Sequence, residues 1–131
     1  MKKLTILLSI LISFSSYGGW FSSDSGLKKV SNSLGNIYYI DTDTIKEYSG
    51  YVYYWYLDDF LKPEYGIMSS KSYVQADCNR SQYKTLSVIH YKQPMGIEQQ
   101  GSSMDGSNTW GPVFDDTVGG ALFNYACDYV K

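Results

Sequence analysis

Two cysteines, Cys78 and Cys127, constrain the fold of this chain more than any other feature of its sequence. Two cysteines allow one intramolecular pairing, and that bond would tie the end of the chain to its middle. Free thiols and metal ligation are the alternatives. His90 is the single histidine, and no metal-ligand spacing links it to the cysteines. Formation of the bond therefore depends on the compartment in which the chain matures.

The first residues, MKKLTILLSILISFSSYGG, have the features of a secretory signal peptide. Lys2 and Lys3 form a basic start, the apolar stretch 4–14 follows, and small residues come next. That stretch is shorter than the roughly 20 apolar residues of a membrane-spanning helix. We expect cleavage after Gly18, with cleavage after Ser15 and an uncleaved N-terminal anchor as alternatives. No cysteine lies near the junction, so we expect no lipid attachment there.

Removal of residues 1–18 leaves 113 of the 131 residues, which is enough for one domain over residues 19–131. Export implies an oxidising compartment, so we expect a disulfide between Cys78 and Cys127. We also expect no stable membrane insertion after signal cleavage. The final location would be the periplasm, the cell surface or the extracellular medium.

The mature chain is mildly acidic, because loss of two lysines leaves nine of the eleven basic residues against thirteen acidic ones. Nucleic-acid binding depends on neutralising phosphates with clustered lysine and arginine, and no such cluster is present. The sequence also has no phosphate-binding glycine loop, serine elbow or metal-binding motif. We therefore expect no cofactor, no metal ion and no nucleic-acid partner.

Most of the chain consists of short strand-forming runs bounded by turn residues, which is typical of an antiparallel sheet. Segment 41–50 is expected to contain one helical turn or an Asx-turn begun by Asp41 or Thr42. Loops are expected at 62–66 and 99–108. The expected strands are LKKVSNS (27–33), GNIYYID (35–41), YVYYWYL (51–57), SSKSYVQADC (69–78), QYKTLSVIHYK (82–92) and the edge piece TWGPVF (109–114), which contains Pro112.

The stretch YVYYWYLDDF (51–60) divides into two stripes, because strand side chains alternate between the two faces of a sheet. One stripe holds Tyr51, Tyr53, Trp55 and Leu57; the other holds Val52, Tyr54, Tyr56 and Asp58. One stripe is expected to pack under the rest of the fold. The second would be covered by the chain's own loops, by a second copy or by a partner, and the sequence leaves open which stripe is which.

The end of the chain, DDTVGGALFNYACDYVK, has helical spacing instead, with Asp115 or Asp116 as the expected N-cap. The apolar arc is wide, which favours a helix set in a groove. Its first row is Val118, Leu122, Tyr125 and Tyr129, and its second is Phe123, Ala126, Cys127 and Val130. The polar face would hold Thr117, Gly120, Asn124, Asp128 and Lys131.

An ordered set of short motifs resembles the bacterial surface-adhesin protein E-like family. The motifs are Trp20 after the signal, YYIDTDTI (38–45), the strand at 51–60, KSYVQADC (71–78), LSVIHYKQPMG (86–96), WGP (110–112) and the cysteine helix ALFNYAC (121–127). The resemblance implies an α+β fold, an antiparallel sheet of about six strands with a C-terminal helix docked on its concave face by a disulfide. It also implies a non-enzymatic binding domain, in some members a host-matrix or plasma-protein adhesin and sometimes dimeric.

Candidate catalytic groups have simpler structural interpretations. His90 lacks a recognisable nucleophile or carboxylate partner, so a small hydrolase built on it is the weakest hypothesis. Asp58 and Asp59 should point to opposite faces, and Asp115 and Asp116 suit a helix N-terminus.

The candidate binding residues are Tyr53, Trp55 and Trp110, because tyrosine and tryptophan are enriched at binding interfaces. The leading hypothesis is a secreted binding module for a protein or glycan. The alternative is a periplasmic envelope-accessory or structural protein that acts through homodimerisation or partner docking.

Overall fold

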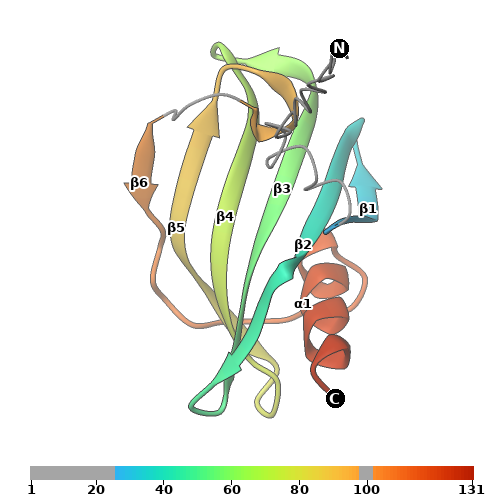
Figure 1. Ribbon diagram of the computed structural model, residues 1–131, viewed down its shortest axis with the longest axis vertical. Coiled ribbons are helices and arrows are strands. Elements are labelled where there is room, and N and C mark those ends of the chain that lie inside the picture. Colours follow the sequence, from blue (N-terminus) through green and yellow to red (C-terminus); the bar gives the residue numbers. More distant parts are fainter. Residues whose placement is uncertain (1–25, 98–101) are drawn as a thin grey trace, which may run out of the picture.

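The computed structural model describes residues 26–97 and 102–131, which form one antiparallel sheet and one C-terminal helix. The predicted signal peptide (1–18) and Trp20 lie outside these residues. The strands are β1 (Leu27–Ser33), β2 (Asn36–Tyr48), β3 (Tyr51–Glu64), β4 (Ile67–Asp77), β5 (Gln82–Tyr91), β6 (Ser103–Asp105) and β7 (Gly111–Pro112). A 3-10 turn, η3 (Pro94–Gly96), follows β5, and helix α1 (Val118–Tyr129) ends the fold (Figure 1).

Each strand from β2 to β6 pairs with the strand before it, so the sheet is a meander. Both β6 and β7 pair with β5 along the edge that β4 leaves free. Pro112 lies in β7, at the edge of the sheet, as predicted for a residue that cannot donate to a strand ladder. The expected fold class is confirmed, with seven strands where the sequence indicated about six.

The core lies between α1 and the even-numbered stripe of β3. Val52 is 2% exposed and Tyr54 is 1% exposed. This stripe is therefore the one that packs inside the fold, which the sequence left open. The remaining buried members of this core are Ile40, Ile45, Val74, Ala76, Leu122, Phe123, Ala126 and Cys127.

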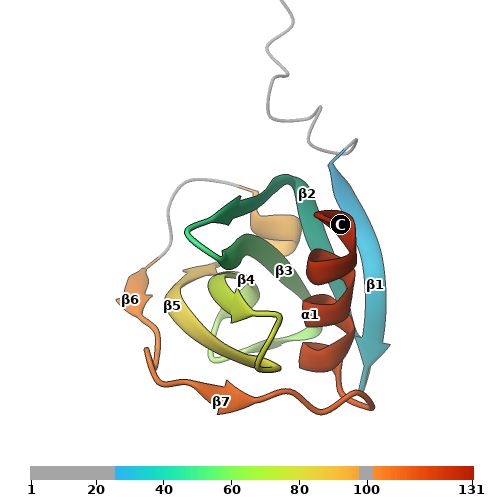
Figure 2. The ribbon, with the colours of Figure 1, turned by 90° about the horizontal axis from the view of Figure 1, so that it is seen from below.

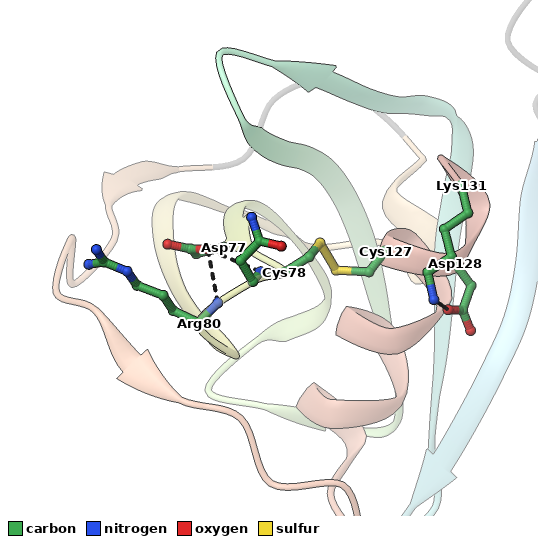
Figure 3. The surroundings of a disulfide bond; sticks show 7 residues. Asp77, Cys78, Arg80, Cys127, Asp128 and Lys131 are labelled. Atoms are coloured by element: carbon green, nitrogen blue, oxygen red, sulfur yellow. Dashed lines mark hydrogen bonds and ion pairs between the residues drawn. A yellow bond between two sulfur atoms is a disulfide. The ribbon is translucent and has the colours of Figure 1, made fainter.

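Helix α1 lies inside the curve that β1 and β2 make, which is the concave side expected for it (Figure 2). The disulfide between Cys78 and Cys127 ties this helix to the turn after β4, with the two Cα atoms 6.0 Å apart (Figure 3). In that turn the backbone N–H groups of Asn79 and Arg80 donate to Oδ1 of Asp77. The predicted covalent link between helix and sheet is confirmed.

The predicted cap of α1 is wrong. Thr117, not Asp115 or Asp116, is the N-cap, since its Oγ1 accepts a hydrogen bond from the N–H of Gly120 at 3.0 Å. Gly120, expected on the polar face, is buried, and a Cβ there would collide with the carbonyl oxygen of Phe114. The segment between β7 and α1, which contains Phe114, therefore packs against this side of the helix.

Strict alternation also fails in β5, where a bulge opposite Tyr73 and Val74 shifts the register. Tyr83 pairs with Ala76 on the helix side, whereas Tyr91 pairs with Ser69 on the other side. Simple alternation along 82–92 would put Tyr83 and Tyr91 on one face of the sheet, and the bulge overturns that expectation.

The structure also decides three local expectations. Segment 41–50 contains no helical turn, because β2 runs to Tyr48 through an irregular stretch. The Asx-turn alternative is confirmed by the N–H of Asp43, which donates to Oδ1 of Asp41 at 3.1 Å. Part of the expected loop at 62–66 belongs to β3, and part of the loop at 99–108 forms β6.

Candidate functional site

The odd-numbered side chains of β3 point away from α1. Near the η3 end of the sheet this stripe is covered by the chain itself. There Leu57 is 1% exposed and Gly96 of η3 comes close to it. Further along β3 the rings are only half-buried. We call this part of the surface the aromatic face and define it as Tyr51, Tyr53, Trp55, Tyr73 and Trp110.

Three rings of the aromatic face form a stack that crosses two strands. Tyr73 of β4 pairs in register with Trp55 of β3, and their ring centroids are 4.9 Å apart at an interplanar angle of 25°. The ring of Tyr73 also stacks on Tyr53, at 6.0 Å and 27°. Stacked rings that stand on a sheet turn their edges and polar tips toward solvent. The stack thus offers an apolar ridge with hydrogen-bonding groups along it.

Trp110 extends this surface from the segment just before β7. The pairing of Gly111 with Tyr83 places it beside β5. Its ring lies 5.6 Å from the ring of Tyr51, and Nζ of Lys84 lies 4.8 Å from its centroid. A cation over an indole is an attractive contact, and it brings a positive charge to the aromatic rings.

The hydroxyl of Tyr53 remains protonated at neutral pH, because its pKa is raised. Burial, with the neighbouring phenols of Tyr73, Tyr51 and Tyr48, raises the pKa of Tyr53 above its ordinary value of 10.0. The hydroxyl of Tyr53 is therefore available as both donor and acceptor.

The structure brings the three candidate residues Tyr53, Trp55 and Trp110 onto one side of the sheet; their role in binding stays a prediction. Sequence reasoning missed Tyr73 and Lys84. The alternation in 69–78 indicated a strand, but the partner of each side chain depends on the register between strands, which the alternation does not specify.

A row of polar residues crosses the opposite, helix side of the sheet. Tyr38, Asp58, Ser70 and His90 are successive cross-strand partners. Oδ1 of Asp58 and Nδ1 of His90 are buried and have no hydrogen-bond partner among residues 26–97 and 102–131. Burial is the main cause that raises the pKa of Asp58 to about 6.

Asp59 points the other way from Asp58, as predicted for neighbours in a strand. Its Oδ1 accepts the N–H of Met95 at 2.7 Å, so it holds η3 in place. Asp115 is also engaged, accepting a hydrogen bond from Nδ2 of Asn124 at 3.4 Å.

Two further observations concern the part of the chain that the structure describes. Its histidine, cysteine, aspartate and glutamate side chains nowhere gather in threes that could hold a metal ion. Its helices are too short or too polar to cross a membrane.

Comparison with known proteins gives the family. Residues 27–128 match the family described as Surface-adhesin protein E. The chain belongs to this family. The resemblance inferred from the ordered motifs is thereby confirmed. No curated protein sequence is significantly similar to the chain.

Solved structures of Haemophilus influenzae protein E share the fold. Crystal form II of that protein aligns with a TM-score of 0.69 and 17% identity, over 82% of this chain and 91% of that one. The protein from a non-typeable strain aligns with a TM-score of 0.56 and 18% identity, over 79% and 74%. At this identity the likeness shows the fold alone.

Proposed function

We propose that the chain is an exported, non-enzymatic binding module of the surface-adhesin protein E family, and that the aromatic face recognises a protein or a glycan. The observation that carries this proposal is the half-exposed stack of Tyr53, Tyr73 and Trp55 on the side of the sheet that α1 leaves uncovered. The family gives the class of function, and the predicted signal peptide supports export.

The chemistry of the aromatic face suits an interface. Tyrosine and tryptophan provide large contact areas with few rotatable bonds. The hydroxyl of tyrosine and the indole N–H of tryptophan can also form hydrogen bonds with polar groups of a partner. Lys84 beside Trp110 adds a cation at one side of the rings. A sugar ring or an extended peptide would both find apolar contact and hydrogen-bond partners here.

Capture of ligands by the mature chain tests the proposal. Residues 19–131 are immobilised and exposed to envelope extract, host-matrix extract and a glycan array. The Tyr53→Ala/Trp55→Ala double variant should lose most of the captured material. Tyr129→Ala is the matched control, because Tyr129 is an exposed aromatic (52%) on α1, away from this face. Equal capture by all three chains would refute a role for the aromatic face.

Cell fractionation separates surface display from the alternative of a periplasmic accessory protein. The adhesin proposal expects the chain at the cell surface or in the medium. Recovery in the periplasmic fraction alone would contradict adhesion. In that case, a shift to monomer in Tyr53→Ala/Trp55→Ala on size-exclusion chromatography would assign the aromatic face to homodimerisation.

A further inference from the structure

Three hairpins of the sheet use the same two-residue turn. The first central residue of each turn has φ of 53° and the second is a glycine with positive φ: Leu34–Gly35, Ser49–Gly50 and Tyr65–Gly66. Both central residues of such turns lie in the left-handed region, which strongly favours asparagine, aspartate or glycine. Leucine and tyrosine are poor choices for this backbone, because a bulky side chain is strained there.

The two unfavourable residues lie at the same end of the sheet. Ile37 pairs with Asp59, and Asp59 pairs with Ser69; the Leu34 and Tyr65 turns both lie beyond this row. Figure 1 shows the hairpin of β3 and β4 at this upper end and the β2–β3 hairpin, which carries Ser49, at the lower end.

The side chains at the upper turns are fully open to solvent. Leu34 is 99% exposed and Tyr65 is 101% exposed. Leu61, 65% exposed, lies against the first turn, where its side chain would meet a Cβ placed on Gly35. This end therefore presents three large apolar side chains. Two of them, Leu34 and Tyr65, occupy a backbone conformation that is strained for bulky residues. The equivalent position at the other end of the sheet holds the smaller Ser49.

Charged side chains also lie at this end of the sheet. Among residues 26–97 and 102–131, the exposed charged side chains beyond the Ile37–Asp59 row are Lys62, Lys92 and Glu64. Two lysines and one carboxylate of the described residues thus lie close to the exposed apolar side chains. Lysine next to an apolar tip is the combination that binds the headgroups and outer acyl region of an anionic bilayer.

We propose that the tips at Leu34, Leu61 and Tyr65 insert into the interfacial layer of a lipid bilayer, while Lys62 and Lys92 contact its anionic headgroups. Separate protruding tips need no shape-matched partner, which distinguishes them from the stacked rings of the aromatic face. Tyrosine is well suited to this depth, because its ring is apolar and its hydroxyl stays hydrated.

Vesicle sedimentation tests this proposal with the mature chain, residues 19–131. The probes are vesicles of phosphatidylcholine alone and of phosphatidylcholine mixed with phosphatidylglycerol. The tip variant is Leu34→Asn/Tyr65→Asn, in which asparagine is compatible with the turn backbone, so the fold is retained. Ser49→Asn makes the same substitution at the opposite end and is the matched control. Circular dichroism and urea midpoints confirm that each chain is folded.

The wild-type chain and Ser49→Asn should sediment with the mixed vesicles, and the tip variant should partition at least about tenfold more weakly. Lys62→Gln/Lys92→Gln should bind the mixed vesicles no better than phosphatidylcholine alone. A wild-type chain that stays in the supernatant with both vesicles overturns the proposal, as does equal binding by the tip variant. Tyr53→Ala/Trp55→Ala should sediment normally, so this result is separable from the role of the aromatic face.

Discussion

Loss of the disulfide should destabilise this fold more than most single core substitutions. Cys78 and Cys127 are 49 residues apart in sequence, and their Cα atoms, 6.0 Å apart, lie within the usual range for a disulfide. Closing a loop of that length restricts the unfolded chain by about 4 kcal/mol in the chain-entropy model. A domain of this size has a net stability of roughly 5–15 kcal/mol, so the bond is a large part of the total.

The Cys78→Ala/Cys127→Ala variant measures this contribution. A change of about 4 kcal/mol corresponds to a melting temperature lower by roughly 15–20 °C in a chain of about 110 residues. Urea unfolding followed by tryptophan fluorescence should give the same free-energy difference. Cys127 also belongs to the core, so the substitution removes some packing. Reduction of the wild-type chain with dithiothreitol removes the bond alone and controls for this loss.

Two results would refute the reasoning. Reduced and oxidised wild-type chains that unfold within about 1 kcal/mol of each other would show that the loop closure adds little. Two reactive thiols in the denatured, unreduced mature protein would show that the bond is absent.

Two further predictions concern a cap and a carboxyl group. Thr117→Ala should cost about 1 kcal/mol of unfolding free energy because it removes the acceptor for the N–H of Gly120, whereas Asp116→Ala should stay within about 0.5 kcal/mol; the opposite ranking would return the cap to the aspartates. Asp58 has a folded pKa of about 6 against an ordinary 3.8, so the folded chain binds its proton more readily and stability should fall as pH rises through that window. Asp58→Asn should flatten this part of a stability–pH profile measured by urea unfolding, and an unchanged profile would contradict the assignment.

The main features of the fold were predictable because they depend on local pattern. Alternation predicted the strand at 51–57 and its two stripes, and helical spacing predicted α1 to within a few residues. The pairing of Cys78 with Cys127 followed from counting cysteines in an exported chain. Each of these inferences needs only the residues of one segment or a single composition rule.

The features that sequence reasoning missed depend on contacts between segments. The bulge in β5 moves Tyr83 and Tyr91 to opposite faces, and no local signal in that strand marks it. Tyr73 joins the aromatic face only through its register with Trp55. The burial of Gly120 reflects the path of the linker around Phe114, which helical periodicity cannot encode. Alternation defines two stripes, but the position of α1 decides which one is covered.

The meander has a consequence for the order in which the chain assembles. Each strand from β2 to β5 pairs with one that is already made, so the sheet can grow from its N-terminal side as the polypeptide emerges. Helix α1 is different, because it packs against β1, β2 and β3 and is made last. Until it arrives, the buried stripe of Val52 and Tyr54 has no cover. The Cys78–Cys127 bond can therefore form only after α1 has been made and has packed on the sheet. If Cys78 is oxidised earlier, Cys127 is not yet present to pair with it.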